Sequence, residues 1–294
     1  MSAKKARLGQ NFLVDRGAAA KIVAALGDVS QRTVMEIGPG KGVLTEPLLR
    51  SAQHVIAVEL DRVLAAELRQ KFGDPQASIG SSDIAMVGPP KLEVLEGDVL
   101  SVDFEAVLQG MSRPQGGGPS GSDRACVLGN LPYYITSDIL LRIFEFHRLF
   151  DLVVIMVQRE VAERIVALPG TRDFGLLSAT AQIYARVEKL FTLPPGAFKP
   201  PPKVYSSVLR LKLAPRFDEL GVPAEGFIAF LKLAFAMKRK TLLNNLKKSY
   251  REEDIKAALN HIGLRPDIRA EAIPLEKSAA VFRVLQLGLD KSKF

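Results

Sequence analysis

Short apolar strands alternate with amphipathic helices through most of the chain, and this alternation constrains the fold more than any other feature of the sequence. Apolar runs that end at glycine or polar turns recur at residues 33–37, 54–59, 92–96, 125–129 and 151–157. Segments with helical apolar spacing lie between them, for example 60–72 and 137–146. This order is typical of βαβ units around a mostly parallel sheet, so the sequence predicts an α/β domain of the Rossmann-like kind.

The pattern changes near Ala214 and Pro215. Three later segments have helical spacing with no strand pattern among them: 224–249, 253–262 and 274–288. We therefore expect two domains, an α/β domain over residues 1–213 and a small all-helical domain over residues 214–294.

Two stretches rich in glycine and proline interrupt the first domain, at residues 73–91 and 110–124. Such composition is typical of surface loops, so we expect both stretches to be insertions without a chemical role.

Charge and cysteine content narrow the class of partner. The net charge is +8, and a basic excess favours a polyanionic partner such as a nucleic acid. The chain has one cysteine, Cys126, and three widely separated histidines, so we expect neither a disulfide framework nor a metal site. No secretory signal and no apolar run of membrane-spanning length is present, and we expect a cytoplasmic protein, a monomer, with no membrane partner.

Glycine or acidic turns follow three successive strands and predict a nucleoside site. The first strand runs into Glu36-Ile37-Gly38-Pro39-Gly40-Lys41-Gly42, where Gly38 and Gly40 let the backbone approach a ligand closely. The third glycine comes one position too early for a dinucleotide fingerprint, which favours a ligand without a pyrophosphate. Glu59 ends the second strand and is expected to accept both hydroxyl hydrogens of a ribose, while Asp98 follows the third strand and is expected to accept from an adenine amino group.

The alternative interpretation is that each of these three turns, taken alone, is an ordinary surface turn whose acidic residue is solvated and binds no ligand. Asp61, beside Glu59, is predicted to cap a helix rather than to bind a ligand.

The tetrapeptide Asn130-Leu131-Pro132-Tyr133 directly follows the fourth strand. An adenine N6 amine is a poor nucleophile because its lone pair is delocalised into the ring. The Asn130 side-chain oxygen and the Leu131 carbonyl offer two acceptors for the two amine hydrogens, an arrangement that would turn the lone pair out of the ring. Pro132 stiffens the turn, and Tyr133 is expected to stack on the base, a contact typically worth about 1–3 kcal/mol. The alternative interpretation is a common proline turn after a strand.

Five segments together resemble the ribosomal RNA small-subunit adenine dimethyltransferase family of the KsgA/RsmA type. They are Leu8-Gly9-Gln10-Asn11-Phe12-Leu13, the glycine turn at 36–42, the tetrapeptide at 130–133, Gln158-Arg159-Glu160-Val161-Ala162-Glu163-Arg164 and Phe198-Lys199-Pro200-Pro201-Pro202-Lys203-Val204. The first, fourth and fifth are specific to this family and its near relatives, whereas the glycine turn alone is not. The resemblance covers nearly the whole chain, and the longer stretches at 73–91 and 110–124 depart from it without touching these motifs.

The resemblance implies a Rossmann-like methyltransferase domain that uses S-adenosyl-L-methionine. It implies that the cofactor is bound by Asn11, Leu13, Gly38, Glu59, Asp98 and Asn130, to which the glycine turn adds Gly40. It also implies two methyl transfers to N6 of each of two adjacent adenosines near the 3′ end of small-subunit (16S) rRNA, giving N6,N6-dimethyladenosine. The implied partner is the assembling 30S ribosomal subunit.

Aromatic and basic residues near these motifs are candidates for RNA contact. Phe198 precedes three prolines and is expected to lie against the second face of an extruded adenine, with a rigid crossover and a core phenylalanine as the alternative. Nine basic residues are expected to contact RNA phosphates: Lys199, Lys203, Arg159, Arg164, Lys238, Arg239, Lys240, Lys247 and Lys248. The alternative is that these residues form ordinary solvent-exposed charged surface, which explains most runs of basic residues. The last five are expected on one helix.

Two other functions stay open at this point. One is a 23S rRNA adenine N6-methyltransferase of the antibiotic-resistance type, which shares the 130–133 kind of motif, although the segments 198–204 and 264–273 fit the small-subunit family better. The other is a non-catalytic ribosome assembly or transcription factor, against which the complete set of cofactor and catalytic residues argues.

Overall fold

The computed structural model describes residues 11–73, 91–109 and 124–291. It divides into two compact units, which we call unit 1 (Met1–Ala162 with Glu188–Leu213) and unit 2 (Glu163–Val187 with Ala214–Phe294). The residue 213 boundary predicted from the sequence coincides with one of these divisions. Residues 163–187, however, associate with the carboxy-terminal helices, so unit 2 is made from two separate stretches of chain. Most of the two predicted insertions, and residues 8–10 of the first motif, lie outside the described residues.

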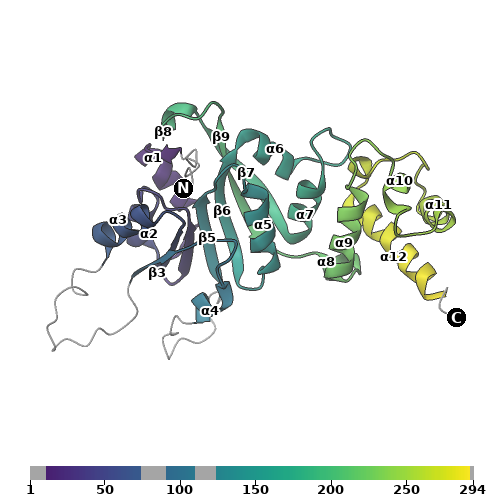
Figure 1. Ribbon diagram of the computed structural model, residues 1–294, viewed down its shortest axis with the longest axis horizontal. Coiled ribbons are helices and arrows are strands. Elements are labelled where there is room, and N and C mark those ends of the chain that lie inside the picture. Colours follow the sequence, from purple (N-terminus) through teal and green to yellow (C-terminus); the bar gives the residue numbers. More distant parts are fainter. Residues whose placement is uncertain (1–10, 74–90, 110–123, 292–294) are drawn as a thin grey trace, which may run out of the picture. The chain divides into compact units, whose positions relative to one another are not determined.

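A seven-stranded sheet of order β4-β3-β2-β5-β6-β9-β7 lies almost entirely in unit 1 (Figure 1). Its strands are β2 (Thr33–Ile37), β3 (His54–Glu59), β4 (Leu92–Glu96), β5 (Ala125–Asn130), β6 (Phe150–Gln158), β7 (Ala185–Leu193) and β9 (Ser206–Leu213). The five predicted strands are β2 to β6, each within one residue at either end, and they pair in parallel as expected. β9 joins β6 in antiparallel register and lies between β6 and β7.

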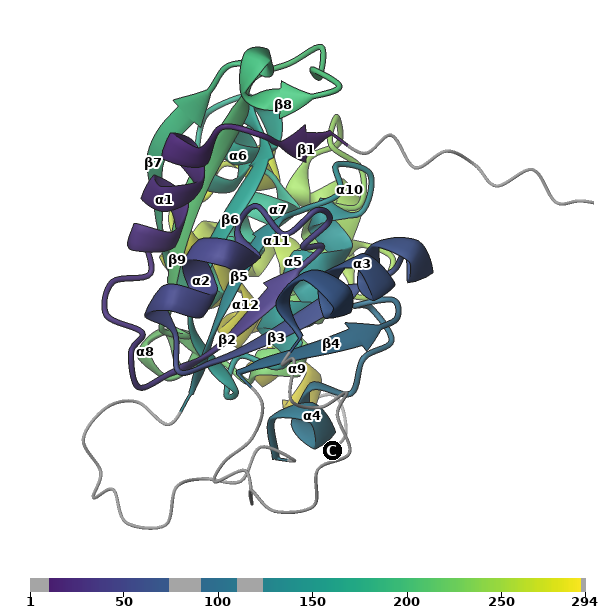
Figure 2. The same cartoon turned by 90° about the vertical axis from the view of Figure 1, so that its left-hand side faces the viewer.

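Helices cover both faces of this sheet, which is why its central strands are apolar on both sides. The helices of this part of the chain are α1 (Arg16–Ala24), α2 (Thr45–Ser51), α3 (Arg62–Phe72), α4 (Phe104–Gln109) and α5 (Thr136–Glu145). Alternate strand side chains such as Val34, Cys126 and Val208 form one core cluster with residues of α1 and α2, while α5 lies on the opposite face (Figure 2). Asp61 caps α3 as predicted, because its carboxylate accepts the Val63 and Leu64 N–H groups at 2.8 and 3.4 Å.

A second, two-stranded sheet joins distant parts of the sequence. β1 (Phe12–Leu13) pairs antiparallel with β8 (Phe198–Lys199), which follows the short 3₁₀ helix η2 (Pro195–Ala197) (Figure 2). The amino-terminal residues are thereby fixed against the segment that begins the proline-rich motif.

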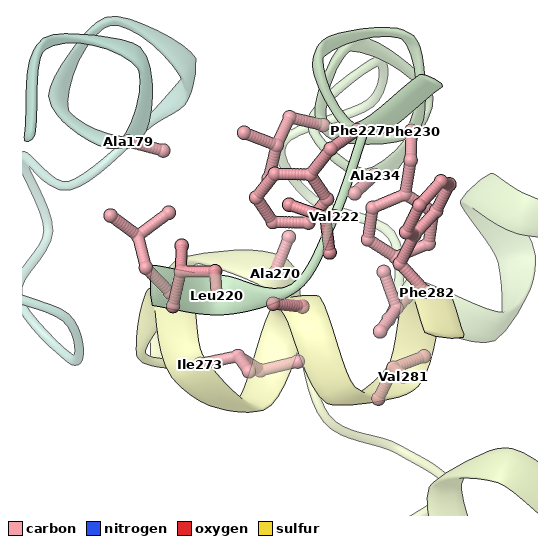
Figure 3. Close-up of a cluster of buried hydrophobic side chains, with 14 of the residues drawn as sticks. Ala179, Leu220, Val222, Phe227, Phe230, Ala234, Ala270, Ile273, Val281 and Phe282 are labelled. Carbon is pink, nitrogen blue, oxygen red and sulfur yellow. The ribbon is translucent and has the colours of Figure 1, made fainter. Parts of the chain in front are cut away.

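Unit 2 is helical, as the sequence predicts for residues after 213. Its helices are α6 (Arg159–Val166, whose first four residues belong to unit 1), α7 (Leu176–Tyr184), α8 (Phe217–Leu220), α9 (Ala224–Ala234), α10 (Leu242–Leu246), α11 (Glu252–His261), η3 (Ala270–Ala272) and α12 (Leu275–Lys291). Phe227, Phe230 and Phe282 form the centre of its core, with ring centroids 5.4 to 6.0 Å apart (Figure 3).

The single helix predicted over residues 224–249 is wrong, because the chain turns between α9 and α10. The buried side chain of Asn245 holds this turn, donating to the carbonyl oxygens of Ala234 and Met237 at 2.6 and 3.3 Å and accepting the Met237 N–H at 3.2 Å. Thr241 caps the new helix by accepting the Asn244 N–H at 3.2 Å. Lys238, Arg239 and Lys240 therefore lie on the turn, and Lys247 and Lys248 follow α10, so the five do not share one helix.

Over the three described stretches, no helix is both long and apolar enough to cross a membrane. The same stretches bring no three His, Cys, Asp or Glu side chains together in a group that would hold a metal ion.

Candidate active site

A cavity of about 270 Å³ lies in unit 1 at the carboxyl ends of β2, β3, β4 and β5. Gly38, Glu59, Asp98 and Asn130, predicted from four separate strand ends, all line it. β2 has β3 on one side and β5 on the other, so the order of connection reverses at β2. Ligands of α/β sheets bind at such a switch point, which makes this cavity the candidate site.

The glycine turn after β2 forms the floor of the cavity and depends on two residues that lack a side chain. Gly38 and Gly40 have φ angles of +65° and +58°, which other residues rarely adopt. A Cβ atom on Gly40 would lie 2.9 Å from Cδ1 of Phe12, another residue that lines the cavity. The turn is therefore closed by contact with the amino-terminal segment, and Phe12 is a site residue that the sequence analysis missed.

Glu59 connects β3 to the glycine turn. Glu59 is 4% exposed, and its carboxylate accepts the Gly40 N–H at 3.0 Å through Oε2 and the Asp61 N–H at 2.9 Å through Oε1. These two bonds fix the carboxylate at the cavity wall. Asp98, by contrast, is exposed and accepts only the Leu100 N–H, at 3.0 Å, among the bonds of its carboxylate described here.

A second acid, Glu36, directly precedes the lining residue Ile37 on β2 and was not singled out from the sequence. Its side chain is fully buried on β2, and Thr45 Oγ1 donates to its Oε2 at 2.7 Å, while Oε1 has no hydrogen-bond partner. Burial raises the pKa of Glu36 to about 8, against the opposing effect of the bond from Thr45.

The Asn130 turn follows β5, the strand next to β2, and forms another part of the cavity wall. The Asn130 side-chain Nδ2 donates to the carbonyl oxygen of Asn11 at 3.2 Å, and the Leu131 N–H donates to the Met156 carbonyl at 3.0 Å. Thr136, the first residue of α5, donates to the Pro132 carbonyl at 3.0 Å. Asn130, Leu131, Pro132 and Tyr133 all line the cavity, so the predicted catalytic turn and the predicted cofactor turn share one site.

Two tyrosines follow Pro132 and differ in exposure. Tyr133 is half-buried, its hydroxyl lies 2.9 Å from Ser206 Oγ, and burial raises the pKa of its phenol. Tyr134 is 63% exposed and also lines the cavity. Tyr134 was not predicted as a site residue, although a second aromatic directly after the tetrapeptide was a visible signal.

The amino-terminal segment covers part of the cavity. Asn11, Phe12 and Leu13 line it, and Asn11 and Leu13 are two of the predicted cofactor residues. The ammonium of Lys41, a further lining residue, lies 5.2 Å from the centre of the Phe12 ring, within the range of a cation–π contact.

Phe198 does not lie where the sequence analysis expected it. It is 3% exposed, belongs to the same hydrophobic core as Leu13, and is absent from the cavity wall. The cause is the pairing of β8 with β1, which sets Phe198 opposite Leu13 and buries both side chains. The structure thus agrees with the alternative interpretation, a core phenylalanine, and the stacking of its ring on a base is not supported.

The nine basic candidates are all exposed, and none lines the cavity. Lys199 lies on β8 and Lys203 follows it. The Arg159 guanidinium lies 5.4 Å from the centre of the Tyr205 ring, and the Arg159 backbone N–H donates to the Tyr205 carbonyl oxygen at 2.9 Å. Arg164 and the five candidates at 238–248 belong to unit 2.

Known proteins resemble this chain over nearly its whole length. Residues 1–287 match the family described as ribosomal RNA adenine dimethylase. A protein of Koribacter versatilis named ribosomal RNA small subunit methyltransferase A is 52% identical over 97% of this chain and 96% of its own length. A protein of the same name from Acidobacterium capsulatum is 48% identical over 96% of this chain and 91% of its own length.

Two solved structures have the same fold. A dimethyladenosine transferase from Plasmodium falciparum has a TM-score of 0.68 at 24% identity. The match covers 96% of this chain and 98% of that chain. The 23S rRNA methyltransferase ErmE has a TM-score of 0.62 at 25% identity, with 94% of this chain and 100% of that chain covered. The family match over nearly all residues and the 52% identity with one relative together place this chain in the ribosomal RNA adenine dimethylase family.

Proposed function

We propose that this protein transfers methyl groups from S-adenosyl-L-methionine to N6 of two adjacent adenosines near the 3′ end of small-subunit rRNA during assembly of the 30S subunit. One observation carries the proposal: the Asn130 turn lines the same cavity as Gly38 and Glu59. A group that holds an amine and a group that holds a nucleoside cofactor thus meet in one cavity.

The cavity wall suits this cofactor. Glu59 lies at the end of β3, where a carboxylate can accept ribose hydroxyls, and the glycine turn lets the backbone approach a ligand. Val58, Leu60 and Val99 add apolar surface for a purine ring. Among the charged lining residues, the carboxylates of Glu59 and Asp98 outnumber the ammonium of Lys41, which favours a ligand with positive charge. When bound, the cofactor supplies an electrophilic methyl group on a sulfonium sulfur.

The chain's own residues hold the amine. Because the donor half of the Asn130 amide is directed to Asn11, its Oδ1 is the half that accepts an amine hydrogen. The Leu131 carbonyl is the second acceptor, and two such bonds turn the nitrogen lone pair out of the adenine ring. Catalysis on this account is mainly alignment, and water takes the proton that the methylated nitrogen releases. Tyr133, fixed through Ser206, and the exposed Tyr134 offer rings for stacking on the base.

RNA is the substrate class that the charge favours. Lys199, Lys203 and the exposed basic residues of unit 2 are the proposed phosphate contacts. The target base must reach the cavity unstacked, so the substrate is a loop or a partly folded region. The small-subunit choice rests on the two relatives of 52% and 48% identity, whose names specify that subunit. The monomeric state and the cytoplasmic location stay predictions.

The test uses ribosomal particles from cells that lack this gene. Purified protein and methyl-labelled cofactor are incubated with isolated 30S and 50S particles, and the labelled nucleosides are identified by mass spectrometry. We expect N6,N6-dimethyladenosine in 30S particles only. Label confined to 50S particles would support the antibiotic-resistance type of activity instead, and no label in either would support a non-catalytic assembly factor.

A further inference from the structure

One hydrogen bond joins the Asn130 turn to β9, the antiparallel neighbour of β6. Ser206 begins β9 and pairs with Gln158 at the end of β6, and its hydroxyl oxygen lies 2.9 Å from that of Tyr133. Ser206 is fully buried, so its place is set by the core of unit 1. β5, which leads into the Asn130 turn, is the other neighbour of β6 (Figure 1). The hydroxyl end of the Tyr133 ring is thus held by a strand that does not itself line the cavity.

The backbone on either side of Tyr133 is fixed as well. The Leu131 N–H donates to the Met156 carbonyl oxygen at 3.0 Å, and Thr136 Oγ1 donates to the Pro132 carbonyl oxygen at 3.0 Å. These bonds place the Tyr133 backbone, but the side chain keeps two rotatable torsions. Within the described stretches, Ser206 is the residue that bonds to the phenol oxygen, and this bond restricts both torsions.

The two methyl transfers of an adenine dimethylase differ in what can hold the amine. In the first transfer the amine offers two hydrogens, one to Asn130 Oδ1 and one to the Leu131 carbonyl oxygen. In each transfer the nitrogen lone pair bonds to the methyl carbon as the carbon–sulfur bond breaks, and the electron pair of that bond stays on sulfur. The nitrogen then releases one hydrogen to water as a proton. The monomethylated amine therefore keeps a single hydrogen and satisfies only one of the two acceptors in the second transfer.

Stacking on the base does not change between the two transfers, because it depends on the ring faces and not on the amine hydrogens. Once one of the two hydrogen bonds is gone, the stacked ring supplies a larger share of the alignment between nitrogen, methyl carbon and sulfur. Since catalysis here is mainly alignment, an error in the position of the Tyr133 ring slows the second transfer more than the first.

We propose that Ser206 is a positioning residue for the second methyl transfer. By fixing the Tyr133 ring, it holds the monomethylated base in line with the methyl group of the cofactor. Ser206 acts through Tyr133 alone, since it is fully buried and does not line the cavity. This proposal rests on the function proposed above and deepens it, because it gives the two transfers at one site different requirements.

The test separates the two transfers by their rates. Protein in excess over 30S particles from cells that lack this gene is mixed with S-adenosyl-L-methionine. Mass spectrometry follows N6-methyladenosine and N6,N6-dimethyladenosine over time, which gives one rate constant for each transfer. We expect Ser206→Ala to lower the first rate constant about twofold and the second about tenfold, the size of one lost hydrogen bond, so that their ratio falls about fivefold. A general loss of active protein would lower both together and leave the ratio unchanged.

Two further variants locate the effect. Tyr133→Phe keeps the ring and removes the other half of the same bond, so it should lower the ratio by the same factor, and the double variant should lower it no further. Ser207→Ala is the matched control, because Ser207 is equally buried, follows Ser206 on β9 and faces the opposite side of the sheet. Its hydroxyl oxygen lies 3.0 Å from Thr192 Oγ1, and neither residue lines the cavity, so we expect the ratio of the unmodified protein.

Three results would overturn the proposal. An unchanged ratio in Ser206→Ala would mean that the bond does not serve the second transfer, and an equal fall in Ser207→Ala would mean that any loosening of β9 has this effect. A different ratio in Tyr133→Phe would mean that Ser206 does not act through the phenol. If Ser206→Ala does not fold, Tyr133→Phe alone tests the bond.

Failure of the proposed function gives a different result. If the unmodified protein methylates 50S particles only, the small-subunit substrate is wrong, and the same two rate constants measured on 50S particles decide whether Ser206 serves the second transfer. If it methylates neither particle, both proposals fail.

Discussion

The two walls of the cavity are built in different ways. The wall after β2 and β3 is mostly backbone held in place by one side chain: two glycines with positive φ, and the buried carboxylate of Glu59, which accepts two main-chain N–H groups. The wall after β5 is made of side chains on a turn, which run from the nearly buried Leu131 to Tyr134 at 63% exposed. A backbone wall recognises the shape of a ligand and tolerates little substitution, whereas a side-chain wall can be altered residue by residue. We infer that the first wall serves a fixed cofactor and the second serves the group to be methylated.

The largest expected effect comes from the side-chain wall. Asn130→Ala removes one of two acceptors for the amine and also the bond to Asn11. We expect kcat to fall by about a thousandfold, a loss similar to that of a key oriented hydrogen bond in other enzymes, with cofactor binding weakened but present. Single-turnover methylation of 30S particles and calorimetry with S-adenosylhomocysteine measure the two quantities. Methyl incorporation at the unmodified rate would refute the assignment of Asn130.

The backbone wall gives the next largest effect. Glu59→Gln places an NH₂ group against the N–H of either Gly40 or Asp61 and removes the charge from the ribose site. We expect the Kd for the cofactor to rise about 50-fold, which corresponds to the loss of a charged hydrogen bond. Glu96→Gln is the matched control, because Glu96 ends the neighbouring strand β4, is exposed and does not line the cavity. An equal Kd for both variants would show that the two walls are not specialised.

A smaller effect is expected at the rim of the side-chain wall. Tyr134→Ala removes an exposed ring next to the cavity, and a lost stacking contact should raise the KM for 30S particles by about tenfold while the cofactor Kd stays constant. Tyr205→Ala is the control, since Tyr205 is 47% exposed and absent from the cavity wall. A rise in the cofactor Kd instead of the KM would move Tyr134 to the cofactor side.

The smallest effect on activity, below about twofold at pH 7, is expected for Glu36→Gln, which acts on stability. Because the pKa of Glu36 is about 8 in the folded state and near 4.5 when unfolded, the folded state binds its proton more tightly. The stability that this proton contributes is fully present below about pH 4.5 and is lost as pH rises to about 8, with a slope of at most about 1.4 kcal/mol per pH unit. The glutamine variant cannot ionise, so its stability advantage over the unmodified protein should grow between pH 5 and pH 8, as measured by urea unfolding. A constant difference across that range would mean that Glu36 does not titrate there.

Sequence patterns found the parts of the fold that burial dictates. β2, β3, β5 and β6 were visible because strands covered on both faces are continuous apolar runs. β4 is a half-buried edge strand with two glutamates, and its place in the alternation of strands and helices made it visible. β9 and β7 were missed because charged residues such as Arg210, Lys212, Glu188 and Lys189 interrupt their apolar positions. β1 and β8 are two residues each and exist only because distant segments meet, which no local pattern reports.

The site shows the same division. Gly38, Glu59, Asp98 and Asn130 were predicted from their places at strand ends, and they meet because the carboxyl ends of parallel strands share one edge of the sheet. Phe198 was misplaced because a phenylalanine before prolines looks the same whether its ring faces a ligand or a core. The turn at 235–241 was read as helix because its two flanking helices have apolar spacing in phase, while the tertiary bonds of Asn245 that break the helix are not visible in the sequence.

The pairing of Phe12 with Lys199 bears on the order in which the protein is made. Residues of the cavity rim leave the ribosome first, but the strand that retains them emerges only after most of unit 1 has been synthesised. A nascent chain that ends before residue 195 contains Gly38, Glu59 and Asn130, yet lacks the Ala197 carbonyl oxygen that accepts the Val14 and Asp15 N–H groups. Translation thus delays completion of the pocket until late in synthesis, and truncated products should retain cofactor poorly even when their central strands have folded.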